Sequence, residues 1–219
     1  MTLFFDFGGT LDTHGIHWFD VFYDAYSQVV PGLSKECLWD CYVNVERLLE
    51  RDSIISRDDS LHEVLSKKID MHALQLGITP TVIETVKNTV SHLTDRCLQT
   101  SKNVLTLLSE EHQLCVVSNF YGNLEHVLDG YGLLHHFSYV IDSGLVGVRK
   151  PDTEIYRLAL SVMHSASEDS VMIGDSLKND IIPARQLGLQ TIHLCPSALE
   201  CKPLPNSIVR SLDDIIDLV

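Results

Sequence analysis

The chain has 219 residues, of which 45% are apolar and 21% charged, a composition typical of a folded globular protein rather than a disordered one. A chain of this size buries roughly 70–75% of its unfolded surface, so it needs neither disulfides nor a structural metal to fold. Sixteen basic against thirty acidic side chains give a net charge of −14. This charge argues against nucleic acid or an anionic membrane surface as the main partner, and an anionic ligand would need a local positive site.

Features that would direct the chain to a membrane or an oxidising compartment are not apparent. No apolar segment approaches eighteen residues, and the start of the chain lacks the basic and apolar pattern of a signal peptide. Cys37 and Cys41 lie four residues apart on a helical pattern, which predicts two thiols on one buried face rather than a metal site. We therefore expect a reducing, cytoplasmic location, with six unpaired cysteines: Cys37, Cys41, Cys97, Cys115, Cys195 and Cys201.

The first predicted strand is Leu3–Phe7, an apolar segment bounded by Asp and Gly. Residues from about 13 to 97 then show apolar side chains at a period of 3.6, which is typical of amphipathic helices. Thr79-Pro80 is a good helix start, with a capping hydroxyl followed by Pro in the first turn. The stripes predict four helices, over 18–29, 38–49, 61–76 and 82–97, with no strand between them.

The second half of the chain alternates between short β-branched segments and helical patterns, which is typical of a mainly parallel α/β sheet with right-handed crossovers. We predict a Rossmann-like, three-layer α/β/α core formed by residues 1–12 and 98–219, with residues 13–97 inserted as an all-α subdomain. The expected strands are Leu114–Ser118, Tyr139–Ile141, Val171–Gly174 and Thr191–Leu194, and the expected helices are Asn123–Tyr131, Asp152–Met163, Asp180–Leu187 and a closing Ser211–Val219.

Polar residues follow the predicted strands, at the edge of the sheet where open α/β proteins bind ligands. Asp6 lies at the end of the first predicted strand, Ser118 ends the second, and Asp175 follows the fourth. Lys150 precedes a predicted helix. Together they supply oxygen ligands for Mg²⁺ and donors for a phosphate.

These four segments, in this order, resemble the motifs of the haloacid dehalogenase-like hydrolases, and the resemblance covers nearly the whole chain. It implies that Asp6 is a nucleophile that forms an aspartyl-phosphate, that Ser118 contacts the phosphate, and that Lys150 offsets negative charge. It also implies that the inserted helices form a cap over the active site.

The resemblance further assigns the metal and phosphate contacts. Mg²⁺ would be held by Asp6, the backbone carbonyl of Gly8, and Asp175, with Asp180 in the surrounding layer, orienting Lys150. We also expect the backbone amides of the loop residues Gly8, Gly9 and Thr10, and of Asn119, to hold phosphate oxygens.

Each of these residues, taken alone, also has a purely structural interpretation. An Asp after a strand often caps a helix, Ser118 would suit a turn, and Lys150 would be a solvated cation. Asp180 would favour a helix N-terminus, which Pro183 supports. Convergence of all of them on one sheet edge favours a functional site.

The sequence departs from most phosphatases of this family at Gly8, where they carry a second Asp that protonates the leaving group. General acid–base catalysis contributes roughly 10²–10⁴-fold, so its loss matters most for poor leaving groups. Three hypotheses remain: a slow or selective hydrolase, a substitute group among His14, His17 and Asp12, or a protein that binds a phosphorylated ligand or a partner without turnover. Proximity in sequence alone makes hinge or surface roles for these three side chains the simpler interpretation.

The sequence thus predicts a Mg²⁺-dependent hydrolase of a small phosphate ester or acyl phosphate. A dehalogenase ranks low because those relatives do not resemble this chain over Gly174–Asp180. A phosphonate-cleaving enzyme would need a desolvated cap lysine, and nothing in the sequence marks Lys35, Lys67, Lys68 or Lys87 as one. The specific substrate and the oligomeric state are not predicted.

Overall fold

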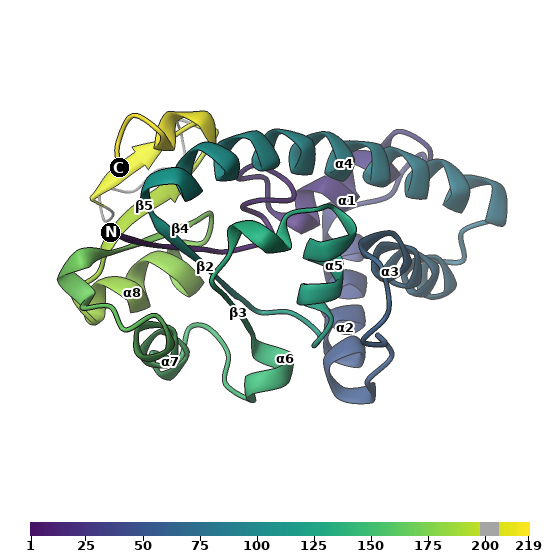
Figure 1. Ribbon diagram of the computed structural model, residues 1–219. Coiled ribbons are helices and arrows are strands. Elements are labelled where there is room, and N and C mark those ends of the chain that lie inside the picture. Colours follow the sequence, from purple (N-terminus) through teal and green to yellow (C-terminus); the bar gives the residue numbers. More distant parts are fainter. Residues whose placement is uncertain (198–205) are drawn as a thin grey trace.

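The computed structural model describes residues 1–197 and 206–219, which form an α/β fold around one parallel sheet (Figure 1). The strand order is β3-β2-β1-β4-β5-β6, so β1 is central and its neighbours come from the second half of the chain. This order confirms the predicted Rossmann-like fold and adds a sixth strand. The strands are β1 (Thr2–Phe5), β2 (Gln113–Ser118), β3 (Tyr139–Asp142), β4 (Ser170–Gly174), β5 (Gln190–Leu194) and β6 (Ser207–Val209).

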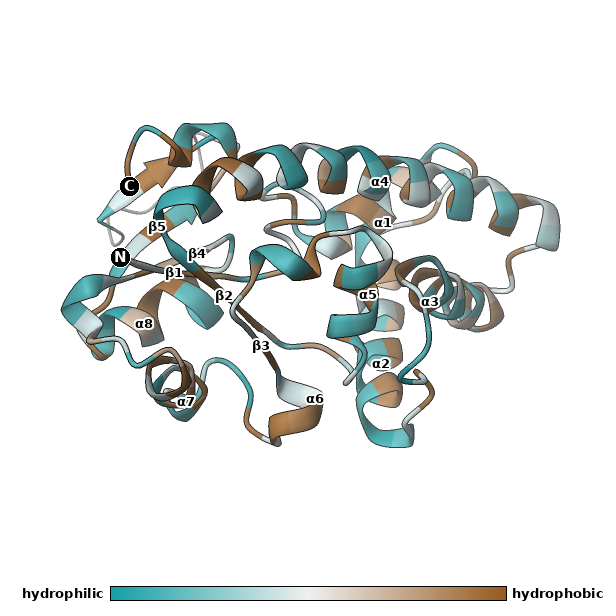
Figure 2. Ribbon diagram, in the orientation of Figure 1, coloured by the Kyte–Doolittle hydropathy of each residue, from teal (hydrophilic) through white to brown (hydrophobic). Residues whose placement is uncertain are grey.

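The sheet is buried on both faces, because helices cover each side. Successive side chains of a strand point to opposite faces, so Leu3 and Phe5 join one apolar cluster while Phe4 joins the other. The apolar strands in the middle of the molecule are visible in Figure 2. The helices that flank the sheet are α4 (Pro80–Glu111) and α5 (Leu124–Gly130) on one face, and α7 (Glu154–Val162) and α8 (Ile182–Gln186) on the other.

Helices also account for the segment that we predict to be the cap, residues 13–97. They are α1 (Trp18–Ser27), α2 (Lys35–Asp52), α3 (Leu61–Leu76) and the first half of α4. Helix α3 begins with a capping box between Ser60 and Glu63, which satisfies two backbone N–H groups at its start. Most buried cap side chains share one apolar cluster with a face of the sheet, and a smaller cluster lies within the cap, formed by Cys41, Val45, Leu49, Ile55 and Val64.

Helix α4 has 32 residues and is therefore about 48 Å long, and it runs from the cap to the sheet. Val86 and Val90 are buried near its start, whereas Leu105 and Leu108 are buried near its end. The predicted domain boundary at 97/98 falls inside this helix. Pro80 occupies the first turn as expected, but Thr79 forms no side-chain capping hydrogen bond.

Several local predictions are wrong. The closing segment Ser211–Val219 is not an amphipathic helix: it holds the short 3-10 helix η4 (Asp213–Ile215), because the chain first forms the edge strand β6 and packs Leu212 and Ile215 locally. Cys37 is exposed and Cys41 is buried, because Cys37 lies in the first turn of α2 and the buried face of this helix begins at Leu38. Cys201 lies outside the described residues.

Three short helices connect the strands in the second half: α6 (Ser143–Val146), η1 (Leu134–His136) and η2 (Ser167–Asp169). The segment expected as one helix from Asp180 to Leu187 is instead a π-helical turn, η3 (Leu177–Ile181), followed by α8. Within residues 1–197 and 206–219, none of the helices has both the length and the apolar character needed to cross a bilayer.

Candidate active site

The residue at the centre of the candidate site is Asp6, directly after β1. The loop that follows is a tight turn in which the carbonyl of Phe7 accepts hydrogen bonds from the N–H groups of Thr10, Leu11 and Asp12. Asp6 itself continues the sheet ladder, because its N–H donates to the carbonyl of Ile173 at 3.0 Å. The loop thereby holds the Asp6 side chain at the carboxyl edge of the central strand.

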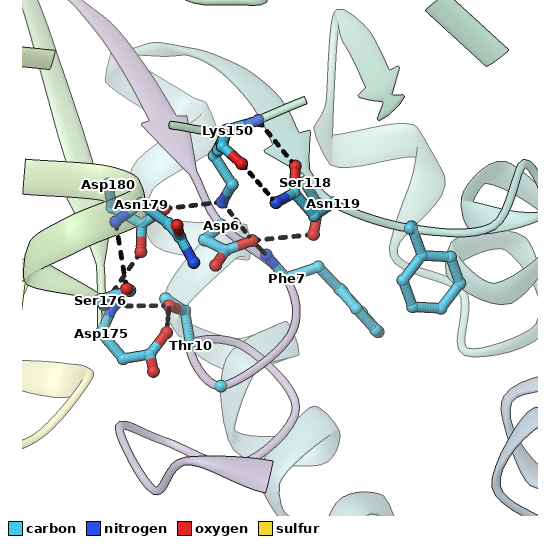
Figure 3. A network of polar contacts seen from close by, with 12 residues as sticks. Asp6, Phe7, Thr10, Ser118, Asn119, Lys150, Asp175, Ser176, Asn179 and Asp180 are labelled. Atoms are coloured by element: carbon cyan, nitrogen blue, oxygen red, sulfur yellow. Dashed lines mark hydrogen bonds and ion pairs between the residues drawn. The ribbon is translucent and has the colours of Figure 1, made fainter. Parts of the chain in front are cut away.

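Three donors converge on one oxygen of Asp6 (Figure 3). Oδ1 accepts from the N–H of Phe7 at 2.7 Å and from Ser118 Oγ at 2.8 Å, and it lies 2.8 Å from Lys150 Nζ. Oδ2 accepts no hydrogen bond from a described residue. The side chain is nearly buried, so one oxygen is fixed while the other stays free for a ligand.

Lys150 lies between two buried carboxylates. Its ammonium is 2.6 Å from Asp180 Oδ1 and 2.8 Å from Asp6 Oδ1. Burial by itself would lower the pKa of Lys150, but the neighbouring carboxylates of Asp180 and Asp6 outweigh it and raise the pKa. Lys150 therefore stays protonated, with its charge directed at Asp6.

Asp180 is held by both of its oxygens. Oδ1 accepts from Lys150, and Oδ2 accepts from the N–H of Ser176 at 2.9 Å. The side chain is fully buried beside Gly174 at the end of β4. This geometry suits the expected role of Asp180, which is to orient Lys150.

Asp175 approaches the same point from the end of β4. Thr10 Oγ1 donates to Asp175 Oδ1 at 3.1 Å, and the N–H of Asp175 donates back to Thr10 Oγ1 at 3.0 Å. Carboxylate oxygens of Asp6, Asp175 and Asp180 lie within 4.8 Å of one another. Burial and the charges of Asp180 and Asp6 raise the pKa of Asp175 well above its ordinary value.

This cluster fits a hard divalent cation. Carboxylate oxygens are the ligands that such ions prefer, and a cation would relieve the repulsion that raises the pKa of Asp175. Asp6 Oδ2 and the outer oxygen of Asp175 accept no hydrogen bond from the described residues, so both can coordinate. The buried Asp cluster could thus bind a metal ion.

The backbone amides predicted to bind phosphate differ in whether their N–H groups are free to donate to a ligand. The N–H of Gly9 donates to Asp12 Oδ1 at 2.7 Å, and that of Thr10 donates to the carbonyl of Phe7. Both groups are therefore used inside the loop. The N–H groups of Gly8 and Asn119 donate to no described residue and remain available for a ligand.

Asn119 has a second function that the sequence did not suggest. Its side-chain amide donates to the carbonyl of Lys150 at 2.9 Å, and its Oδ1 accepts from the N–H of Lys150 at 2.8 Å. This pair of hydrogen bonds joins the end of β2 to the segment before α7. It positions the backbone of Lys150 so that the ammonium reaches Asp6.

The space beside Gly8 borders Trp18, the first residue of α1. A Cβ at position 8 would lie 3.8 Å from Trp18 Nε1, an ordinary contact. Trp18 Nε1 donates to Asp12 Oδ2 at 3.0 Å. Both carboxylate oxygens of Asp12 therefore accept hydrogen bonds, from Gly9 and Trp18, and Asp12 does not line the cavity at Asp6.

The two histidines near the loop also differ. His14 Nε2 lies 3.0 Å from Ser101 Oγ, on the side of α4, and does not line the cavity. His17 does line it, and its Nδ1 accepts from the N–H of Phe19 at 3.1 Å. Of the three candidates for a substitute acid or base, only His17 faces the cavity.

A cavity of about 260 Å³ opens over Asp6, Ser118, Lys150 and Asp175. Its opposite wall comes from the cap and from the loop after β2, and several of its residues were not predicted. Lys68 had a sequence signal: it lies on the apolar face of α3, four positions after Val64, where a charged residue is unusual. The structure corrects the view that no cap lysine is desolvated, since Lys68 is 8% exposed. The unpredicted lining residues are Trp18, Tyr42, Glu46, Glu50, Lys68, Phe120, Tyr121, Arg149, Ser176 and Asn179.

With this geometry established, comparison with known proteins assigns the chain to a family. Residues 4–194 match the haloacid dehalogenase-like hydrolases. The chain belongs to this family. Among its relatives are phosphoserine phosphatase of Thermus thermophilus, 43% identical over 65 residues (30% of this chain, 26% of that protein), and glyceraldehyde 3-phosphate phosphatase of Methanocaldococcus jannaschii, 30% identical over 91 residues (40% of each chain). The matched segments cover less than half of either relative.

Solved structures of other haloacid dehalogenase-like proteins share the fold. A magnesium-bound HAD-hydrolase from Bacillus subtilis has a TM-score of 0.63 at 20% identity and covers 99% of this chain and 97% of its own. L-2-haloacid dehalogenase from Xanthobacter autotrophicus has a TM-score of 0.62 at 16% identity, with the same coverage. The chain is thus a hydrolase-family protein whose fold occurs in proteins of different activities.

Proposed function

We propose that this protein is a Mg²⁺-dependent phosphatase that hydrolyses a phosphate monoester or acyl phosphate of a small metabolite through an aspartyl-phosphate on Asp6. The observation that carries the proposal is the convergence of Ser118 and Lys150 on one oxygen of Asp6, beside the free oxygens of Asp6 and Asp175. Phosphatases among the relatives support the same reaction class.

A carboxylate can attack an anionic phosphate only if the repulsion between them is offset. Protonated Lys150, held by Asp180, supplies one positive charge at the Asp6 carboxylate. Mg²⁺ held by Asp6, Asp175 and the carbonyl of Gly8 would supply further charge neutralisation at the phosphoryl oxygens. Catalysis of this kind consists mainly of positioning and electrostatic stabilisation.

In the first step one oxygen of the Asp6 carboxylate forms a bond to phosphorus as the bond to the leaving-group oxygen breaks, and the other oxygen would be the one that holds Mg²⁺. The N–H groups of Gly8 and Asn119 are free to donate to the phosphoryl oxygens, and Ser118 Oγ, which donates to Asp6 Oδ1 in this structure, would turn to a phosphoryl oxygen when the substrate binds. In the second step water attacks the aspartyl-phosphate, which releases phosphate and restores Asp6. The leaving group departs with the electron pair and takes its proton from water or from a neighbouring side chain.

The first prediction is that the Asp6→Asn variant loses hydrolytic activity. The substitution keeps the size of the side chain but removes the nucleophile, so turnover of p-nitrophenyl phosphate should fall roughly 10³-fold or more. Turnover by the unmodified chain should also stop on chelation and return with added Mg²⁺. Asp129→Asn, at an exposed carboxylate of α5, is the matched control and should stay fully active. Retained turnover in Asp6→Asn, with thermal unfolding unchanged, would remove Asp6 from the mechanism.

A second prediction concerns Gly8. Because position 8 has no side chain to protonate the leaving group, kcat/KM should fall steeply across a series of aryl and alkyl phosphates as the leaving-group pKa rises. Trp18 leaves room for a Cβ at position 8, so Gly8→Asp should fit and flatten this dependence. Gly8→Asn, of equal size but unable to transfer a proton, should not flatten it.

A shallow dependence in the unmodified chain would show instead that another group donates the proton. His17 would then be the residue to test, because it lines the cavity, and His17→Phe should make the dependence steep. No turnover of any phosphate, combined with Mg²⁺-dependent binding, would favour the ligand-binding alternative.

A further inference from the structure

The cavity wall opposite Asp6 contains a pair of charged residues that the mechanism does not use. Lys68 on α3 and Glu46 on α2 both line the cavity, and Lys68 Nζ lies 2.9 Å from Glu46 Oε1. Tyr121, in the loop after β2, lies beside both. These residues come from the cap and the loop that face the position where the leaving group would extend.

The Lys68 ammonium retains hydrogen-bonding capacity. Its side chain is 10% exposed, and its contacts with described residues are the ion pair with Glu46 and the ring of Tyr121, whose centroid is 5.0 Å away. The contact with Glu46 uses one of its three N–H groups, so two donors remain for a ligand. An ammonium has three donors, so a buried one that lines a cavity can bind an acceptor on a ligand.

Glu46 retains an acceptor at the adjacent atom. Its Oε2 accepts a hydrogen bond from the Tyr121 hydroxyl, which fixes the carboxylate. Its Oε1 is buried and lies 2.9 Å from Lys68 Nζ, so the ion pair takes up one of its acceptor positions. A carboxylate oxygen has two lone pairs, so Oε1 can accept a second hydrogen bond from a ligand.

The charge balance decides which ligand group suits this pair. Lys68 and Glu46 neutralise each other, Arg149 is paired with Glu50, and the carboxylates of Asp6 and Asp175 outnumber the remaining cation of the lining, Lys150. A carboxylate on the ligand would accept from Lys68 but would face Glu46 Oε1, which it cannot donate to and which repels it. A hydroxyl can accept from Lys68 and donate to Glu46 Oε1, with no added charge.

We propose that Lys68 and Glu46 bind a hydroxyl group of the leaving group, so that the substrates are phosphate monoesters of small polyhydroxylated alcohols. This inference rests on the proposed phosphatase activity and narrows its substrate class. The cavity of about 260 Å³ holds the phosphate as well, so a leaving group of a few carbons fits within it. An alcohol without the hydroxyl leaves the remaining donors of Lys68 and the second acceptor position of Glu46 Oε1 without a ligand partner, so it should be hydrolysed less efficiently.

The test compares kcat/KM for three substrates of similar size: glycerol 3-phosphate, n-propyl phosphate and 3-phosphoglycerate, with p-nitrophenyl phosphate as a general measure of turnover. Glycerol 3-phosphate should exceed n-propyl phosphate by at least about tenfold, and it should also exceed 3-phosphoglycerate. Lys68→Met, which keeps the length of the side chain, should bring the ratio of glycerol 3-phosphate to n-propyl phosphate close to one. Glu46→Gln is a second variant that keeps the shape of the wall, and it should lower the same ratio.

Lys67→Met is the matched control, because the adjacent Lys67 pairs with Asp59 and does not line the cavity. It should leave the substrate ratios unchanged. Three results would overturn the inference: a ratio of glycerol 3-phosphate to n-propyl phosphate near one in the unmodified chain, a preference for 3-phosphoglycerate, or an unchanged ratio in both Lys68→Met and Glu46→Gln. If p-nitrophenyl phosphate were still hydrolysed, the phosphatase proposal would stand in each of these cases. No hydrolysis of any phosphate, including p-nitrophenyl phosphate, would overturn both.

Discussion

Asp12 shows at the scale of a single residue how the nucleophile loop is supported. The carboxyl group is 1% exposed and accepts from the N–H of Gly9 and from the indole of Trp18, so it joins the loop to the start of α1. Burial raises its pKa to about 7, although these two hydrogen bonds act in the opposite direction. The desolvation cost of the charged carboxylate therefore exceeds the stabilisation that its two hydrogen bonds provide. As a result, Asp12 is mainly protonated in the folded protein below neutral pH.

This raised pKa predicts a pH dependence of stability. An unfolded Asp titrates near 3.8, so between about pH 4 and pH 7 the folded state binds a proton that the unfolded state has lost. The contribution of Asp12 to the free energy of unfolding is fully present below pH 4, and it is lost as the pH rises to 7, by on the order of 4 kcal/mol. Asp12→Asn does not titrate and should lack this component.

The measurement is urea unfolding of both proteins between pH 4 and pH 8. The unmodified chain should lose stability relative to Asp12→Asn up to about pH 7 and then run parallel to it. Asp129→Asn should follow the unmodified chain throughout, because that carboxylate is exposed. Parallel curves for the unmodified chain and Asp12→Asn over the whole range would contradict the assignment of the raised pKa to Asp12.

At the scale of an element, the end of β4 shows why a glycine precedes Asp175 and the turn η3. The turn η3 brings the side chain of Asp180 back over Gly174, where Asp180 meets Lys150 and the N–H of Ser176. A Cβ on Gly174 would lie 2.6 Å from the Cβ of Asp180. Because Asp180 is fully buried and bonded by both oxygens, it cannot move aside without losing Lys150.

Gly174→Ala should therefore lower the free energy of unfolding by about 1–3 kcal/mol, the usual cost of overpacking a core. Phosphate hydrolysis should fall as well, because Lys150 would lose its position relative to Asp6. Gly130→Ala is the control: a Cβ there meets no atom within 4 Å, so stability should stay the same or rise slightly. Both variants can be compared by urea unfolding, and equal stability for the two would contradict the steric argument.

At the scale of the whole molecule, the cavity is completed by contacts between residues far apart in the chain. Arg149 pairs with Glu50 of α2, and Tyr121 donates to Glu46 of the same helix. The side chain of Asn123 donates to the carbonyl of Asp59 at 2.8 Å, just before α3. These contacts dock the cap onto the sheet edge that carries Asp6, and helix α4 connects the two continuously (Figure 1).

Much of the core architecture could be predicted from the sequence, because each buried strand is an apolar segment with polar residues at its carboxyl end. Parallel strands place those ends at one edge, so the meeting of Asp6, Ser118, Lys150 and Asp175 followed from their order alone. The prediction of a helix over Ser211–Val219 is wrong because a short amphipathic pattern does not distinguish a helix from locally packed turns.

The amino-acid sequence by itself determined the fold class, the family and the residues at the strand ends, since these depend on local patterns and on motif order. Only the tertiary structure decided which groups are free to act. It placed His17 at the cavity and directed Asp12 and His14 elsewhere, and it used the amides of Gly9 and Thr10 inside the loop. The physical reason is that hydrogen bonding and desolvation depend on neighbours brought in from distant segments, and no spacing along the chain specifies those neighbours.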